Sequence, residues 1–156
     1  MGSGLDLDED RLWRAEAHNS IVNLEGAYAR TWDTADAAGW AALFTGDGIF
    51  ERVDVPGKPG RRKQGRRELE DFCRDFNVGW GRVHMIHSYE IDVDGESASS
   101  RLSFECRRIL VGDHPCHGIT TGFYDVDYVF EGGRWLIAHR RERQVFYREE
   151  SYFGVC

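Results

Sequence analysis

Four successive segments in the second half of the chain alternate apolar and polar residues, and this pattern constrains the fold more than any other feature. Alternation with a period of two is typical of strands that bury one face. The pairs Asp94-Gly95 and Gly132-Gly133, which lie between segments, are typical of tight hairpin turns. The sequence therefore predicts neighbouring antiparallel strands near residues 82–93, 98–111, 118–130 and 134–147.

The first half of the chain has a helical periodicity instead. Apolar residues recur there at spacings of three and four, which predicts an amphipathic helix of more than twenty residues. The residues on its apolar face are Trp13, Ala17, Ile21, Leu24, Tyr28 and Trp32. Acidic residues before this helix suit its N-terminal end, and residues 1–8 are expected to form a flexible lead-in. Thr34 or Asp36 would cap the helix that follows.

Shorter elements are expected between the long helix and the strands. A second helix would carry Trp40, Leu43 and Phe44 and would end at the turn residues Gly46-Asp47-Gly48. Beyond it, we expect a strand over 49–55, a returning strand over 61–64 and a third helix over 66–77.

Helices followed by antiparallel strands indicate an α+β fold. The chain has 156 residues without a linker or repeat, so a single domain over residues 1–156 is expected. Three N-terminal helices would pack on a curved, mixed but mostly antiparallel sheet and leave a pocket open at one end, in the shape of a cone. The expected core residues are Trp13, Ile21, Leu24, Phe44, Leu69, Phe72, Ile91, Phe104 and Trp135.

Charge and composition limit the partners and the compartment. The net charge of −7 disfavours nucleic acid as a partner. No apolar run approaches the roughly 18 residues of a membrane-spanning helix, so no membrane partner is expected. The four cysteines form no CxxC pair, and we expect them to be reduced in a cytoplasmic protein. A sheet face rich in aromatic residues would be buried in a homodimer or homotrimer.

Two histidines in the first long strand, His84 and His87, are the most conspicuous candidates for chemistry. Histidine titrates near neutral pH and is uncommon in strands. In a regular strand His87 shares one face with the apolar Ile91 and Val93, whereas His84 shares the other face with Ile86. If the apolar face lines the pocket, His87 points inward, unless a β-bulge re-aims one of the two.

A metal site and a bound cofactor are both weakly supported. His84, His87, His114, Cys116 and His117 are residue types that bind zinc, but their spacing matches no standard zinc motif. The sequence also lacks a glycine-rich phosphate loop, a Rossmann fingerprint and a GxSxG elbow. We therefore expect neither a metal nor a cofactor.

The order of elements and four sequence segments resemble the SnoaL-like branch of the NTF2-like superfamily. The segments are Tyr28 to Phe50, Gly65-Arg-Arg-Glu-Leu-Glu, the strand starting His84-Met-Ile-His87-Ser-Tyr-Glu-Ile, and Gly122-Phe-Tyr-Asp together with Gly133-Arg-Trp-Leu-Ile-Ala-His-Arg140. Together they span nearly the whole chain. The nearest parallels are cofactor-free enzymes, namely the bile-acid 7α-dehydratases, scytalone dehydratases and hexachlorocyclohexane dehydrochlorinases.

This resemblance implies a catalytic dyad of Asp33 and His84, with Tyr28 as a hydroxyl in the pocket. Imidazole can remove an acidic C–H proton, and a carboxylate on its other nitrogen fixes the tautomer and stabilises the imidazolium. From its position alone, Asp33 is equally well a cap residue at a helix junction. The pattern of the family matches His84 rather than His87, so His84 is the first candidate for the base and His87 the second.

Further pocket residues are expected to contact the substrate: His87, Cys106, Arg140, Tyr124, Phe104 and Trp32. Arg140 matches the arginine of the dehydrochlorinase pattern and would bind an enolate, a carboxylate or a leaving anion. Cys106 stands where the bile-acid enzymes have an acid, so an identical reaction is not implied. Cys106 is read either as a small core residue or as a nucleophile.

The expected function is that of a cofactor-free lyase or isomerase, of the dehydratase or cyclase type. Its substrate would be a hydrophobic polycyclic, steroid-like or polyketide-like small molecule. The alternative is a non-catalytic binding or assembly subunit, because this superfamily hosts both enzymes and inert binders. The joint presence of Tyr28, Asp33 and His84 favours the enzyme.

Overall fold

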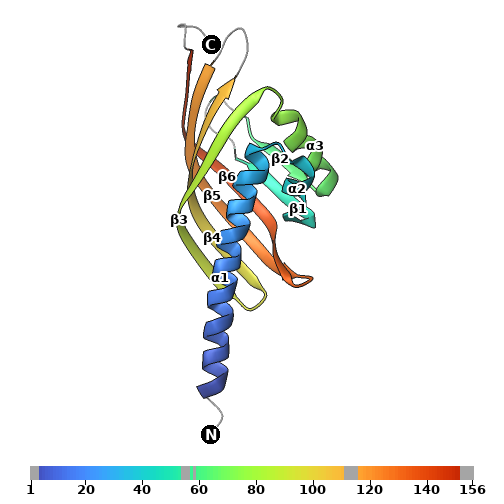
Figure 1. Ribbon diagram of the computed structural model, residues 1–156, viewed down its shortest axis with the longest axis vertical. Coiled ribbons are helices and arrows are strands. Elements are labelled where there is room, and N and C mark those ends of the chain that lie inside the picture. The colour runs from blue at the N-terminus through green and yellow to red at the C-terminus, as the bar shows by residue number, and fades with distance from the viewer. Residues whose placement is uncertain (1–3, 54–56, 58, 111–115, 152–156) are drawn as a thin grey trace.

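A long N-terminal helix and a six-stranded sheet form the main layers of the protein in the computed structural model (Figure 1). The structure describes residues 4–53, 57, 59–110 and 116–151. Within them the helices are α1 (Gly4–Asp33), α2 (Ala37–Ala41) and α3 (Arg66–Phe76). The strands are β1 (Phe44–Arg52), β2 (Arg61–Gln64), β3 (Trp80–Asp94), β4 (Ser97–Leu110), β5 (Cys116–Glu131) and β6 (Arg134–Ser151). The α+β class is confirmed.

The sheet is mixed, with the strand order β2-β1-β6-β5-β4-β3. Strands β3 to β6 form an antiparallel meander, as their hairpin turns predict. Strand β1 lies parallel to β6, so the first strand of the chain joins the edge of the meander through its last strand. Strand β2 pairs antiparallel with β1 and completes the sheet.

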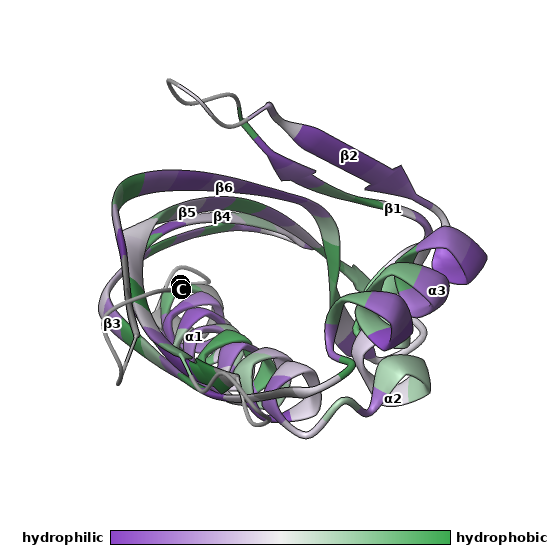
Figure 2. Ribbon diagram, turned by 90° about the horizontal axis from the view of Figure 1, so that it is seen from above, coloured by the Kyte–Doolittle hydropathy of each residue, from purple (hydrophilic) through white to green (hydrophobic). Residues whose placement is uncertain are grey.

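The sheet is strongly curved and encloses one side of α1 (Figure 2). Helix α1 contacts β3 and β6, whereas α2 packs mainly on α3 beside β1 and β2. The three helices therefore differ in role: α1 fills the concave face of the sheet, and the two shorter helices close one end. Asp36 begins α2 as its N-cap, since its carboxylate accepts a hydrogen bond from Gly39 N at 3.0 Å.

The core lies between α1, the short helices and the concave face of the sheet. Most of the expected core residues are buried: Ile21, Leu24, Phe44, Leu69, Phe104 and Trp135. The remaining three, Trp13, Phe72 and Ile91, are partly buried and pack against this core. Trp40 is fully buried and contacts the rings of Trp32 and Phe44, with centroid distances of 4.8 and 4.9 Å.

Several local predictions differ from the structure. The expected lead-in is already helical from Gly4. The glycine pair Gly46 and Gly48 lies inside β1 at a register irregularity and does not end the second helix in a turn, because β1 continues along β6 there. Cys116 is disulfide-bonded, so the prediction that all cysteines are reduced is wrong for this residue. Cys73 and Cys106 are free and buried.

Apolar side chains remain exposed on the meander: Val83, Ile109, Phe123, Val145, Phe146 and Tyr147. The homodimer or homotrimer that such a surface suggests stays a prediction. None of the helices in the described part of the chain combines the length and the apolar character needed to cross a membrane.

Candidate active site

A small cavity of about 60 Å³ lies between the end of α1, helix α3 and the concave face of the sheet. Aromatic rings form much of its wall: Tyr28, Trp32, Phe50, Phe72, Phe76, Phe104 and Tyr124. Polar lining comes from His84, Cys106, Thr120, Glu142, Gln144 and the arginines Arg52, Arg61, Arg82 and Arg108. A volume of this size holds a few water molecules, so a hydrophobic ligand would enter only after side chains at the rim move.

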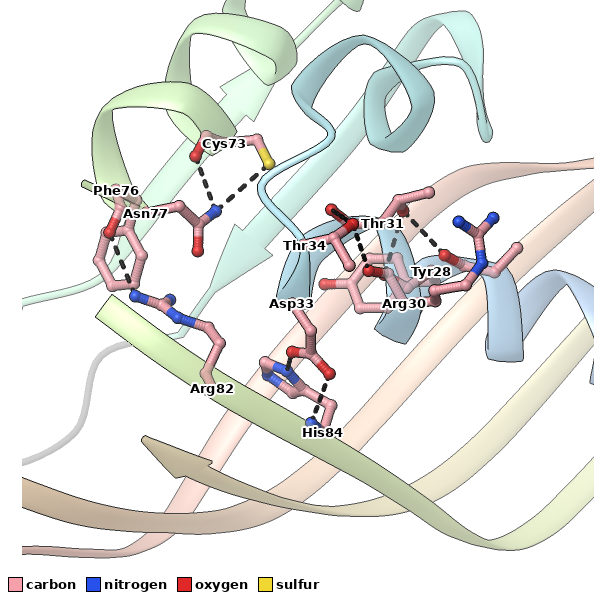
Figure 3. A network of polar contacts seen from close by, with 11 residues as sticks. Tyr28, Arg30, Thr31, Asp33, Thr34, Cys73, Phe76, Asn77, Arg82 and His84 are labelled. Atoms are coloured by element: carbon pink, nitrogen blue, oxygen red, sulfur yellow. Dashed lines mark hydrogen bonds and ion pairs between the residues drawn. The ribbon is translucent and has the colours of Figure 1, made fainter. Parts of the chain in front are cut away.

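Asp33 and His84 form a close pair at the wall of this cavity, as Figure 3 shows. The carboxylate of Asp33 contacts Nδ1 of His84 at 2.6 Å with one oxygen. Its other oxygen accepts a hydrogen bond from the backbone N–H of His84 at 2.8 Å. The imidazole lines the cavity, whereas Asp33 lies behind it. The carboxylate therefore fixes both the position and the tautomer of the ring.

Asp33 is the last residue of α1. The C-terminal end of a helix carries a partial negative charge, which disfavours a carboxylate there. The chain also turns sharply after Asp33, with Ala35 in the left-handed region at a φ of 57°. A cap role for Asp33 is not seen, because both carboxylate oxygens contact His84. The contacts of the Asp33 carboxylate with His84 on β3 offset the unfavourable interaction of its negative charge with the helix end.

A β-bulge in β3 decides which histidine points inward. The register shifts between His87 and Glu90, and Ser88 has a φ of 53°. The extra residue reverses the alternation, so Val93 is buried on the same face as His84. His87 pairs with Ser103, is exposed and does not line the cavity. The structure thus gives no support to His87 as a substrate contact.

Two opposing influences act on the charge of His84. Burial is the larger single influence and lowers the pKa of the ring, but hydrogen bonds with Asp33 and Cys106 outweigh it and raise the pKa to about 9. Cys106 lies directly across from His84 in the β3–β4 ladder and also lines the cavity. The ring is consequently an imidazolium at neutral pH.

The raised pKa of His84 predicts a pH dependence. Titration of the His84 ring, followed by NMR of its Cε1–H signal, should have a midpoint near pH 9. Because the pKa is higher in the folded protein than the usual 6.5, the pair stabilises the fold fully below about pH 6.5 and loses this effect as the pH rises through 9. Asp33→Asn should move the midpoint to lower pH, and an unchanged midpoint would contradict the assigned cause.

Arg140 lies away from the cavity, contrary to the expectation that it binds substrate. It is fully buried and does not line the cavity. Its guanidinium carbon lies 3.6 Å from the ring centre of Tyr28 and 3.8 Å from that of Tyr124. Nη1 donates to both carboxylate oxygens of Glu25, at 2.9 and 2.8 Å. Arg140 therefore supports the two tyrosines from behind the cavity wall.

Glu25 is a structural partner of Arg140 that is absent from the residues predicted from the sequence. It is fully buried on α1 and also accepts a hydrogen bond from the hydroxyl of Tyr128 at 2.7 Å. That hydroxyl contacts Ser100 at 2.8 Å. The available signal was its spacing, since Glu25 falls four residues after Ile21 on the apolar face of the helix. A carboxylate at such a position needs a buried cation.

The remaining predicted residues do line the cavity: Tyr28, Trp32, Phe104, Cys106 and Tyr124. The rings of Phe104 and Tyr124 stack with centroids 4.2 Å apart. Burial raises the pKa of the Tyr28 hydroxyl well above its usual range, so this group stays a neutral donor. The structure brings these residues to the same space as His84, although their contact with a substrate stays a prediction.

One of the possible zinc-binding residues, His114, lies outside the described residues, so the predicted absence of a metal site stays a prediction there. Within the part of the chain that the structure describes, no group of three histidine, cysteine, aspartate or glutamate side chains is arranged to hold a metal ion. His84 and His87 lie on opposite faces of β3, because they are three residues apart in a stretch of regular pairing.

Known proteins resemble this chain in sequence or in fold. An uncharacterised protein of Mycobacterium tuberculosis is 27% identical over 134 residues, which cover 85% of this chain and 86% of that protein. Two solved structures from Novosphingobium aromaticivorans share the fold. One, provisionally assigned as a scytalone dehydratase, has a TM-score of 0.75 at 21% identity and covers 86% of this chain and 88% of its own.

The second structure is an NTF2-like protein with a cystatin-like fold. It has a TM-score of 0.69 at 18% identity and covers 93% of this chain and 92% of its own. The family model of the SnoaL-like domain matches residues 13–141, which include α1, the cavity and almost the whole sheet. This chain belongs to the family of SnoaL-like domains.

Proposed function

We propose that the protein is a cofactor-free lyase or isomerase that removes a proton from a carbon beside a carbonyl group. The observation that carries this proposal is the double contact of Asp33 with the ring and the backbone of His84, at the wall of an aromatic cavity. A base oriented by a carboxylate is the arrangement that general base catalysis needs.

The proposed first step is a proton transfer. The neutral imidazole of His84 takes the proton through the nitrogen that faces away from Asp33, and the C–H electron pair becomes an enolate. Asp33 stabilises the imidazolium that forms, while the neutral hydroxyl of Tyr28 donates a hydrogen bond to the enolate oxygen. Because His84 has a raised pKa, the neutral base is a minor form at pH 7 and its population grows toward pH 9.

The second step depends on the substrate. If a hydroxyl group lies β to the carbonyl, the enolate expels it and the imidazolium supplies the proton, so water leaves and His84 is neutral again. If no leaving group is present, the proton returns at another carbon and the product is an isomer. The fold shared with a provisionally assigned scytalone dehydratase is consistent with the first route. The aromatic cavity wall favours a hydrophobic substrate.

The test is deuterium exchange into simple hydrophobic ketones. Ketones such as 1-tetralone would be incubated with the protein in deuterated buffer at about pH 9, near the pKa of His84, and the loss of the α-proton signals followed by NMR. We expect exchange well above the rate in buffer alone. Ketones that bind, as shown by line broadening, yet retain their α-protons would contradict the proposal.

A binding protein without catalysis is the second candidate. The observation that favours it is the imidazolium form of His84 at neutral pH, because a cationic ring there can hold an oxygen anion without moving a proton. The exchange experiment separates the two functions. Binding without exchange over the whole range from pH 6 to 10 is the result expected of a binding protein.

A further inference from the structure

Cys106 on β4 is a thiol at the cavity wall that the proposed reaction does not use. It lies directly across from His84 in the β3–β4 ladder, and both side chains line the cavity. Cys106 forms no disulfide and is only 7% exposed. A ligand inside the cavity therefore reaches this sulfur, whereas bulk solvent scarcely does.

Three side chains with the chemistry of a nucleophilic triad follow one another at this wall. The carboxylate of Asp33 contacts Nδ1 of His84 at 2.6 Å. Because Nδ1 is occupied, Nε2 is left for the hydrogen bond between the ring and Cys106. A carboxylate that orients an imidazole, and an imidazole that takes the proton of a thiol, form the arrangement that activates a cysteine nucleophile.

The positive charge of His84 meets a second requirement for a reactive thiol. Burial lowers the pKa of the His84 ring, but its hydrogen bonds with Asp33 and Cys106, and the negative charges of these partners, raise the pKa to about 9. A cation beside a cysteine stabilises its thiolate, which is the reactive form. Arg82 is a second cation near this sulfur, because burial lowers its pKa and the negative charge of Cys106 acts against this effect.

We propose that Cys106 is a nucleophile that forms a covalent bond with small α,β-unsaturated ketones bound in the cavity. The sulfur lone pair of the thiolate forms a bond with the β-carbon, and the electron pair of the C=C bond moves toward the carbonyl oxygen to give an enolate. The imidazolium of His84 then gives its proton to the α-carbon. The product is a thioether, His84 is neutral, and the step needs no further reactant.

The cavity suits such ketones in its size and its lining. The neutral hydroxyl of Tyr28 is a hydrogen-bond donor for the carbonyl oxygen. Phe104 and Tyr124 offer apolar surface to a flat conjugated ligand. A volume of about 60 Å³ excludes a polypeptide chain, so peptide cleavage by the same three residues is not expected.

This inference goes beyond the proposed function and does not rest on it. Addition to the ketone uses the imidazolium form of His84, which predominates at pH 7. The proposed removal of a C–H proton uses the neutral ring, whose population grows toward pH 9. The two reactions therefore depend on different protonation states of one histidine.

Labelling with 2-cyclohexenone tests the inference. The protein would be incubated with this ketone at pH 7, and peptide mapping by mass spectrometry would locate the adduct in the unmodified sequence. We expect an adduct on Cys106 that forms at least about 10-fold faster than that of N-acetylcysteine, because an ordinary thiol is mostly protonated at this pH. No adduct on Cys106, or one that forms no faster than that of N-acetylcysteine, would overturn the inference.

Cys73 is the internal control in the same sample. It is the other free cysteine in the described part of the chain, is fully buried and does not line the cavity. Its sulfur accepts a hydrogen bond from the amide of Asn77 at 3.4 Å (Figure 3), and burial raises its pKa to about 11. Cys73 should stay unlabelled. Labelling of Cys73 at the rate of Cys106 would overturn the role assigned to the cavity and to His84.

His84→Ala separates activation of the thiol from access to it. The substitution opens space beside Cys106 but removes the imidazolium, so access alone predicts faster labelling, whereas the triad predicts labelling at least about 10-fold slower. Asp33→Asn should also slow labelling, since the ring loses a partner that raises its pKa. The matched control is His87→Ala, exposed on the other face of β3, which should label like the wild type. Labelling of His84→Ala as fast as the wild type would overturn the triad.

The inference and the proposed function can fail separately. Deuterium exchange into 1-tetralone is measured on the same protein samples. Rapid labelling of Cys106 without exchange would overturn the proposed reaction and leave the nucleophile intact. Exchange without labelling would overturn the nucleophile and leave the proton transfer intact.

Discussion

Asp33→Asn is expected to lower the rate of deuterium exchange into 1-tetralone about 10²- to 10⁴-fold, the range that general acid–base catalysis contributes. The amide keeps the shape of the carboxylate but loses its charge. It would present an N–H to a ring nitrogen or to the backbone N–H of His84, where the carboxylate now accepts at 2.6 and 2.8 Å. The imidazole then loses its fixed tautomer and the partner that stabilises its protonated form.

His84→Ala should lower exchange at least as much as Asp33→Asn. The double variant should be little worse than the poorer single variant, because the two groups act as a unit. His87→Ala is the matched control, three residues further along β3 but exposed on the other face. Ligand line broadening and circular dichroism would show that binding and folding persist. Normal exchange in His84→Ala together with its loss in His87→Ala would contradict the assignment.

Because of the bulge at Ser88, simple alternation along β3 predicts the wrong histidine to face the cavity. Strict alternation through β3 places His87 with Ile91 and Val93, and nothing in the residue pattern locates an extra residue between His87 and Glu90. The resemblance to the family indicates His84, whereas the periodicity of the strand indicates His87. A bulge depends on the pairing of β3 with β4, which is a property of two strands rather than one.

Local patterns predicted the elements that bury a continuous apolar face. Helix α1, helix α3 and the meander of β3 to β6 follow from spacing and turn residues because each pattern repeats many times. The glycine-rich start of β1 predicts a turn instead of a strand, since Gly46 and Gly48 have no side chain whose burial would indicate a strand. There the parallel pairing with β6, a contact between the two ends of the chain, determines the structure.

Charged residues inside the fold were the least predictable part of the site. The match with the dehydrochlorinase pattern predicts Arg140 in the cavity, but Arg140 is buried with Glu25 instead. A second bulge, between Asp127 and Tyr128 in the β5–β6 ladder, shifts the register just before Arg140 and directs it inward. The cavity arginines Arg82 and Arg108 could have been found, since each lies two residues from a predicted site residue on the same strand face.

Glu25→Gln is expected to cost about 3–5 kcal/mol of unfolding free energy, the usual loss when one partner of a buried ion pair is removed. Glutamine keeps the volume of glutamate and leaves no cavity. It removes the only carboxylate that contacts Arg140 among the described residues, and both Glu25 and Arg140 are fully buried. Chemical denaturation followed by tryptophan fluorescence measures the loss.

The matched control for this prediction is Asp125→Asn, which breaks the exposed pair with Arg101 and should cost far less. The double variant Glu25→Leu with Arg140→Met should recover much of the stability, because apolar side chains of similar size can replace a buried ion pair. Since Arg140 also supports Tyr28 and Tyr124 behind the cavity wall, the recovered variant should still exchange ketone protons more slowly than the wild type. A Glu25→Gln variant as stable as Asp125→Asn would show that the buried pair does not hold this wall together.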